Sequence, residues 1–427
     1  MKIPNLARDT ILNMLGSILP LLVGLITIPY LLNNLGKESF GILTIMWAIV
    51  GYFGLFDLGV GRALVYQVSV RSLNNCKKDI DIALQSGLVL TLLTGTFGAI
   101  LIAFLLAPNA HSLFSIVQSS EIEVFYSFIW IAFATIPTTI SSGLRGAAEG
   151  LKYFGKSSSN RAIVGSSLFL FPALSILIIE NISIVHIGAS IFIARVIGSM
   201  HIFLCLINFF KTLHKISYEL MVTLIKYGGW ASASGVIGPI MIYGDRFILA
   251  SIIGVANIAA YSIAQEINTK ALVIPSAFSN AILPRLARSF DSEELKKKYM
   301  GGLKTIFKMM FPISFVIFIT SPYMLSIWIG PEIADEISLI MQILVIGLFI
   351  GSFGQISLAG LYSISKPKIV AAVHFFELLF YLIFLYYLSK YYGLFGAALC
   401  WTIRVIIDSA VLHALYLREL KRLNYGN

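Results

Sequence analysis

Twelve apolar runs, each about twenty residues long, follow one another along the chain with short polar segments between them. A helix of about 20 residues spans the hydrocarbon core of a bilayer, which is about 30 Å thick. The pattern therefore predicts an all-α, polytopic membrane protein with about 12 transmembrane helices, near residues 11–34, 40–61, 83–107, 122–144, 162–180, 184–208, 227–250, 256–281, 304–326, 337–361, 369–389 and 393–416.

The composition supports this interpretation, because 58% of the residues are hydrophobic and only 12% are charged. A soluble domain usually carries about 25% charged residues, so this chain has too few to cover a water-facing surface. The first apolar run, Ile11 to Leu35, is too long for a signal-peptide core and is expected to stay as the first span. The three cysteines share no metal-ligand spacing, so no metal site and no cofactor are predicted.

Basic residues concentrate in every second loop and at both termini. The intervening loops carry mainly acids, such as Glu121, Glu123 and Glu180. Because cytoplasmic loops of membrane proteins are enriched in Lys and Arg, both termini are predicted to be cytoplasmic. The net charge of +10 is thus a signal of topology rather than of nucleic-acid binding. The basic loop segments are 62–78, 145–161, 211–226, 285–308 and 366–368.

The two halves of the chain resemble each other at a spacing of about half its length. Three matches recur at separations of 218, 210 and 209 residues: Leu35-Gly36 with Ile253-Gly254, Gly150-Leu151 with Gly360-Leu361, and Arg195-Val196-Ile197 with Arg404-Val405-Ile406. Six spans in each half give both halves one orientation, as in parallel repeats related by an axis along the membrane normal. We predict two pseudo-symmetric six-helix bundles, 1–210 and 227–427, joined by a cytoplasmic linker at 211–226.

One short motif suggests a nucleotide site. Residues Gly150 to Ser157 match G-x-x-x-x-G-K-[ST], the phosphate-binding loop, which works only between a buried strand and a helix. Here the match follows an apolar helix in a basic loop, so we interpret it as a coincidence. No Ser/His/Asp or paired-carboxylate arrangement stands out either, and the chain is not predicted to be an enzyme.

Three cations, Arg195, Lys270 and Arg404, lie near the middle of apolar runs. A charge at the bilayer centre costs at least about 2.5–3.5 kcal/mol, so such a residue usually faces a wet cavity or a partner. Glu266 precedes Lys270 by four residues and Asp408 follows Arg404 by four, so internal ion pairing is an open alternative for both.

Arg195 has no acidic residue within four positions in the sequence, which favours a role in an anion-binding cavity. The planar guanidinium binds two oxygens of a phosphate or pyrophosphate at once. Acids in apolar surroundings take up protons more readily, so they are candidates for coupling to an ion gradient or for ion pairing. These acids are Asp57, Asp245, Glu266, Glu377 and Asp408.

Several stretches resemble polysaccharide flippases of the Wzx type, in the multidrug/oligosaccharidyl-lipid/polysaccharide exporter superfamily. The likeness runs the full chain, in order and spacing as well as in residues. It includes Asn13–Ser17 with Pro20 and Pro29–Leu31, then Leu35–Ile42, Phe56–Leu64, Leu144–Leu151 and Gly244–Ile248. Charged residues at these motif positions are Asp57, Arg62, Arg145, Glu149, Asp245 and Arg246.

The resemblance implies that the protein moves undecaprenyl-pyrophosphate-linked oligosaccharide units across the bacterial inner membrane for O-antigen, lipopolysaccharide or capsule biosynthesis. It also implies alternating access around a cationic central cavity, proton or sodium coupling, and polymerase or chain-length proteins as partners. Arg62 and Arg246 would then join the mid-span cations in binding pyrophosphate. Arg145 and Glu149 are equally explained by an i,i+4 pair at the inner face. Two alternatives stay open: a cation-coupled multidrug exporter of the same superfamily, and a structural membrane protein that transports nothing.

Overall fold

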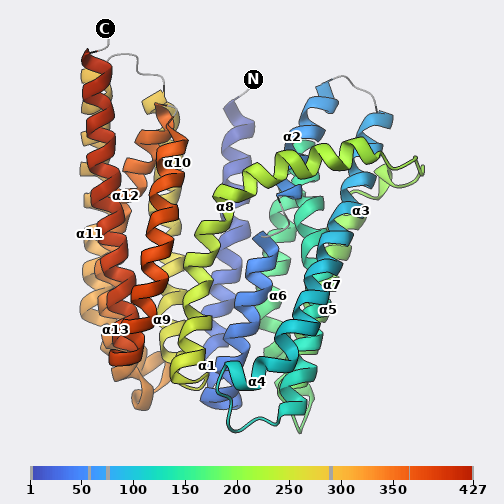
Figure 1. Cartoon of the computed structure of the whole chain (residues 1–427), viewed down its shortest axis with the longest axis vertical. Helices are drawn as coiled ribbons and strands as arrows, with labels where there is room; N and C mark the ends of the chain where they lie inside the picture. The colour runs from blue at the N-terminus through green and yellow to red at the C-terminus, as the bar shows by residue number, and fades with distance from the viewer. Residues whose placement is uncertain (1–2, 56–58, 74–76, 288–291, 365, 426–427) are drawn as a thin grey trace. The chain divides into compact units, whose positions relative to one another are not determined.

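The computed structural model describes residues 3–55, 59–73, 77–287, 292–364 and 366–425, and these form helices and turns with no strand among them. The prediction of an all-α protein is confirmed. The chain divides into two compact units, unit 1 from Met1 to Phe247 and unit 2 from Ile248 to Asn427 (Figure 1).

Unit 1 is built from long helices that lie side by side (Figure 1). Its elements are α1 (Ile3–Leu55), α2 (Val60–Leu73), α3 (Lys77–Leu101), the π-helical turn η1 (Ile102–Leu106), the 3₁₀ turn η2 (Ala107–Asn109), α4 (Ala110–Leu113), α5 (Glu121–Gly150), α6 (Phe154–Ile178), α7 (Ile184–Cys205), the 3₁₀ turn η3 (Ile207–Phe209) and most of α8 (Tyr218–Ile253).

In unit 2, α12 packs against both α11 and α13. Its elements are α9 (Ile258–Ala271), α10 (Val273–Ala287), α11 (Ser292–Ile329), α12 (Pro331–Ser363) and α13 (Pro367–Tyr425).

Each predicted span lies mainly in helix among the described residues, although residues 56–58 of the second span lie outside them, and two helices each contain most of a pair of spans. The first two spans share α1, which bends at Gly36 (φ 75°, ψ 169°), and the last two share α13, which bends at Gly393 (φ 57°, ψ −137°). Both bends need a positive φ, which glycine adopts without the steric cost of a Cβ. The eighth span is divided between α9 and α10. Among the described residues, eight helical segments are long and apolar enough to cross a membrane.

The predicted linker, 211–226, is partly helical, because α8 already begins at Tyr218. The irregular part is held to α3 by Gln85, whose amide donates to the carbonyls of Phe209 (3.0 Å) and Thr212 (2.7 Å) and accepts from the N–H of His214 (2.9 Å). The helix α8 then continues to Ile253, past the boundary between the two compact units. The predicted division into two bundles at this linker stays a prediction.

Small residues let the helices of unit 1 approach closely. A Cβ at Gly188 of α7 would lie 2.7 Å from the backbone oxygen of Ser127 on α5, so a larger side chain does not fit there. On the other side of α5, Thr139 donates to the carbonyl of Thr91 on α3 at 2.9 Å. Such small-residue contacts and hydroxyl bonds hold helices together in lipid, where the hydrophobic effect gives no attraction between them.

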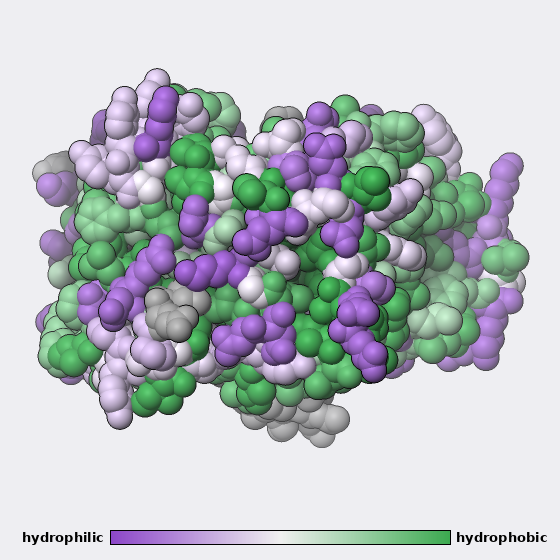
Figure 2. Space-filling model, turned by 90° about the horizontal axis from the view of Figure 1, so that it is seen from below, coloured by the Kyte–Doolittle hydropathy of each residue, from purple (hydrophilic) through white to green (hydrophobic). Residues whose placement is uncertain are grey.

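Many large apolar side chains on the helices and turns are exposed. Ile26, Phe104 and Leu177 are each more than two-thirds exposed. Seen along the helices from below, hydrophilic residues lie interspersed among hydrophobic ones (Figure 2). Exposed apolar side chains on helices of this length are expected of a multi-pass membrane protein, since lipid is their solvent.

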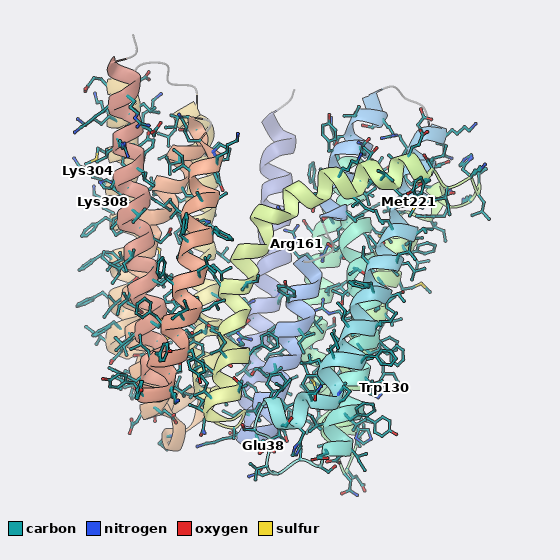
Figure 3. The ribbon with its side chains drawn as sticks, in the orientation of Figure 1. Glu38, Trp130, Arg161, Met221, Lys304 and Lys308 are labelled. Atoms are coloured by element: carbon teal, nitrogen blue, oxygen red, sulfur yellow. The ribbon has the colours of Figure 1, made fainter. Side chains whose placement is uncertain are left out.

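Glu38 fixes the bend between the first two spans. Its side chain is 4% exposed and accepts three backbone N–H bonds, from Val117 (3.0 Å), Gln118 (2.8 Å) and Ser119 (2.9 Å). These bonds tie the region of the Gly36 bend to the loop before α5, at the lower end of unit 1 in Figure 3. The Glu38 carboxylate therefore accepts hydrogen bonds from backbone N–H groups that lie in a loop outside any regular helix.

Replacing Glu38 by Ala should lower the stability of the folded protein by roughly 3 kcal/mol, because three backbone N–H groups lose their charged acceptor. The measurement is the thermal unfolding midpoint of the purified protein in detergent. Glu180→Ala is the matched control, since Glu180 is exposed. Equal midpoints for the two variants would contradict the assigned role.

Candidate functional site

A cavity lies in unit 2, along the two arms of α13. The arms, 367–392 and 394–425, are joined by the bend at Gly393. They line a half-open groove of about 880 Å³. Its walls are almost wholly apolar, with aromatic rings along the first arm, and they are formed by Ile369, Ala372, Val373, Phe376, Glu377, Phe380, Tyr381, Phe384, Leu388, Cys400, Ile403, Arg404, Ile407, Asp408 and Val411.

Four polar side chains meet in this apolar groove region. Arg404 Nη1 lies 3.2 Å from Glu377 Oε1, and His374 Nε2 lies 3.7 Å from Asp408 Oδ1. The side chains of Arg404 and Glu377 are only 15% and 9% exposed. Each contact joins one arm of α13 to the other, so these polar side chains are paired across the bend.

The helical period explains why these residues converge. His374 and Glu377 are three residues apart on the first arm, and Arg404 and Asp408 are four apart on the second. Residues at these spacings share one face of a helix. The bend at Gly393 folds the two faces toward each other, which produces the cluster.

Aromatic rings and α12 hold Arg404 in place. Its guanidinium carbon lies 5.1 Å from the ring centre of Tyr381 and 5.8 Å from that of Trp401, within the range of cation–π attraction. Trp401 packs on Gly347 of α12, where an added Cβ would lie 2.5 Å from its ring. Thr402 donates to the carbonyl of Ile343, also on α12, at 2.9 Å.

Farther along α13, a second polar contact anchors the same arm. The hydroxyl of Tyr299 on α11 lies 2.6 Å from His413 Nδ1 and 2.8 Å from Ser357 Oγ on α12. Tyr299 and Tyr416 are fully buried, with ring centres 4.4 Å apart. The second arm of α13 is therefore fixed by side chains from α11 and α12, and Arg404 is presented on a firmly packed helix.

The other predicted site residues of unit 2 form the pair foreseen as an alternative. Lys270 Nζ lies 3.2 Å from Glu266 Oε1, one turn apart on α9, and both side chains are part-buried. Arg404, by contrast, contacts Glu377 on the other arm of α13, a pairing that was not predicted from the sequence. Sequence reasoning also missed His374, whose only signal was its position three residues before Glu377.

In unit 1, Arg195 lies in the middle of α7 and is 9% exposed, so it is buried as expected of a mid-span cation with a structural or functional partner. Asp245 and Arg246 on α8 are 0% and 3% exposed, and the N–H of Arg246 donates to Asp245 Oδ1 at 2.7 Å. Arg62 on α2 is exposed. Asp57 lies outside the described residues.

In unit 1, a buried polar network centred on Asn160 joins α5, α6 and α7. Asn160 is fully buried; its amide oxygen accepts from Ser141 at 3.0 Å and its amide nitrogen donates to the Gly198 carbonyl at 2.6 Å. The ring nitrogen His201 Nδ1 is 3.4 Å away. Gly198 is three residues after Arg195, so the network braces the helix that carries this cation.

The phosphate-loop match at Gly150–Ser157 runs from the last residue of α5 into the first turn of α6, and a helix rather than a strand precedes it. Its Lys156 donates to the carbonyl of Cys205 at the end of α7 (2.9 Å), and its Ser157 donates to Glu149 (2.7 Å). Glu149 also pairs with Arg161 at 3.1 Å. These residues fasten helix ends together, and Arg145 lies part-buried one turn before Glu149 on α5.

Comparison with known proteins identifies the family. Residues 6–290 match the model described as "Polysaccharide biosynthesis protein". The chain belongs to this family. Residues 241–387 also match the MatE family. A Shigella flexneri protein named "Putative O-antigen transporter" is 31% identical over 97% of this chain and 98% of its own length.

Solved structures of transporters share the fold. An inward-facing multidrug resistance MATE family transporter of the MOP superfamily superposes with a TM-score of 0.76 at 15% identity, covering 96% of this chain and 99% of the other. A MOP superfamily transporter from Pyrococcus furiosus gives 0.67 at 17% identity, covering 98% and 96%. The relatives are transporters, so the prediction of a membrane transporter rather than an enzyme is confirmed.

The Arg404–Glu377 contact should behave as a mutually dependent pair. Removing one partner leaves the other charge buried and should cost roughly 3 kcal/mol, whereas removing both should cost less than the sum of the two. The variants are Arg404→Met, Glu377→Leu and the double substitution, compared by thermal unfolding in detergent. Strictly additive losses would show that the two side chains do not stabilise each other.

Proposed function

We propose that this protein translocates undecaprenyl-pyrophosphate-linked oligosaccharide units from the cytoplasmic to the outer leaflet of the bacterial inner membrane, by alternating access of its two predicted bundles. Membership of the polysaccharide biosynthesis family and the O-antigen transporter relative support this function. The units would then enter O-antigen, capsule or a related polymer, with polymerase and chain-length proteins as partners.

The observation that carries the proposal is Arg404, a buried arginine beside an apolar groove in membrane-spanning helices. A lipid-linked oligosaccharide has an anionic pyrophosphate next to an isoprenoid chain. The guanidinium suits the pyrophosphate, because its planar fork binds two oxygens at once. The groove suits part of the chain: residues 369–388 rise about 28 Å along the helix, close to the thickness of the hydrocarbon core.

Arg195 is proposed to serve the same substrate from the first half of the chain, as the counterpart of Arg404 in the sequence repeat. Further positive charge along the path of the substrate would come from Arg246, Lys270 and Arg62. We further propose that the acids beside these cations, among them Asp57, Asp245 and Glu266, either balance that charge or couple transport to a proton or sodium gradient.

A cation-coupled drug exporter is the second candidate, favoured by two observations. The groove carries several aromatic rings together with Glu377 and Asp408, a combination suited to lipophilic cations. The fold is shared with multidrug resistance transporters. The exporter would tolerate loss of Arg404, whereas the flippase would not.

To test the flippase, Arg195→Ala and Arg404→Ala are introduced into the gene and surface polysaccharide is measured in a strain lacking the chromosomal copy. Each change should reduce polymer at least about tenfold, since one charge-assisted contact contributes about 1.5–3 kcal/mol. Arg418→Ala is the matched control, because Arg418 is exposed on the same helix as Arg404.

Normal polymer at normal protein abundance in both variants would overturn the role of the arginines. Drug susceptibility is measured in the same strains. Increased susceptibility of the deletion strain, with unchanged polysaccharide, would favour the exporter instead.

We also propose that both termini face the cytoplasm, from the distribution of Lys and Arg among the loops. A fluorescent protein that folds only in the cytoplasm, fused after Asn427, should therefore be bright. A periplasmic phosphatase fused at the same point should be inactive and should gain activity when fused in the loop at Glu180. The reverse pattern would refute the orientation.

A further inference from the structure

The groove presents an electrostatic problem for the proposed substrate. Arg404 would attract a pyrophosphate, but Glu377 and Asp408 lie beside it in the same groove. Two carboxylates and one guanidinium give a net charge of −1 when both acids are ionised and His374 is neutral. In a site of low dielectric, this charge would repel the anion that the groove is proposed to receive.

The cluster has the donors of a cation site. One ligand atom from each of His374, Glu377 and Asp408 lies within 4.8 Å of the others. These are an imidazole nitrogen and two carboxylate oxygens. Atoms that share an ion at about 2.1 Å lie at most about 4.2 Å apart, so binding requires the side chains to close by about half an ångström.

A second observation points to a ligand at this place. The Glu377 side chain is only 9% exposed, and its Oε2 has no hydrogen-bond partner in the structure. Its other oxygen, Oε1, is the one that contacts Arg404. Asp408 Oδ1 likewise has no hydrogen-bond partner, since His374 Nε2 stands 3.7 Å away. A buried carboxylate oxygen left without a partner is costly, and a bound cation would satisfy both.

We propose that His374, Glu377 and Asp408 bind a divalent cation, such as Mg²⁺ or Mn²⁺, that bridges the groove to the pyrophosphate of the substrate. The proposal rests on the proposed function for the identity of the anion, and on the cluster alone for the cation. Glu377 then joins the two halves of the site, with Oε1 on Arg404 and Oε2 on the ion.

The chemistry of these ions fits the arrangement. Mg²⁺ is usually held by one or two carboxylates together with substrate phosphates, rather than by a complete cage of protein ligands. A divalent ion changes the charge of the cluster from −1 to +1, so the acids become part of the pyrophosphate site instead of opposing it. The imidazole of His374 favours transition metals such as Mn²⁺ over Mg²⁺ in the absence of substrate.

The cation site is tested first without lipid. Purified full-length protein in detergent is titrated with Mn²⁺, and bound ion is followed by electron paramagnetic resonance. Wild-type protein should bind Mn²⁺, and Glu377→Gln or Asp408→Asn should weaken binding at least about tenfold. Glu294→Gln is the matched control, because Glu294 is paired with Lys298 on the exposed surface of α11. Equal binding by the control and by both groove variants would overturn the site.

The bridging role is tested with farnesyl pyrophosphate, a short isoprenoid pyrophosphate, as the probe in calorimetry. Wild-type protein should bind it at least about tenfold more tightly with Mg²⁺ than with EDTA, and Glu377→Gln and Asp408→Asn should lose this difference. Mg²⁺ also binds the probe in solution. The comparison with Glu294→Gln therefore isolates the effect of Mg²⁺ on affinity that depends on the groove.

The two proposals fail in different ways. Binding of the probe that is equally tight with Mg²⁺ and EDTA would overturn the bridge and leave the flippase function standing. Mn²⁺ binding at the cluster with no binding of the probe would support the cation site and count against the pyrophosphate substrate. Size-exclusion chromatography of each variant shows whether it is folded. If Glu377→Gln does not fold, Asp408→Asn still tests the site.

Discussion

A charge inside a membrane protein must find a partner, and the architecture of unit 2 around α13 follows from that requirement. Arg404 on the second arm meets Glu377 on the first, and the bend at Gly393 makes the meeting possible. A continuous helix without the bend would leave both charges facing lipid, at a cost of several kcal/mol each. The Arg404–Glu377 ion pair therefore depends on the bend at Gly393.

The same constraint shapes unit 1 through the hydrogen bonds of buried polar side chains. Asn160 joins three helices through Ser141 and the Gly198 carbonyl, and Glu38 satisfies three successive N–H groups where α1 bends. In lipid, a backbone or side-chain group without a partner costs more than it does in water, so these contacts decide where helices can end, bend and cross.

A transporter gains from holding its charges in exchangeable pairs. A fully apolar groove would hold an isoprenoid chain but would give no specificity for a pyrophosphate, and a groove with unpaired arginines would be difficult to insert into the membrane. Under the proposed function, Arg404 beside Glu377 would meet both demands, because the acid balances the arginine and would share it with a bound pyrophosphate. This balance also explains why acids accompany the cations of a protein proposed to carry an anionic lipid.

The sequence by itself determined the helices, because spans of about twenty apolar residues and the alternation of basic loops depend only on local composition. It also indicated Arg195, Lys270 and Arg404, since a charge is conspicuous in an apolar run, and a spacing of one turn gave the Glu266–Lys270 pair as an open alternative. Only the tertiary structure decided that Arg404 meets Glu377 and that His374 joins Asp408. These residues lie more than twenty-five positions apart, and their contact depends on how the Gly393 bend and the packing of α13 on α12 orient two helical faces, which no local pattern records.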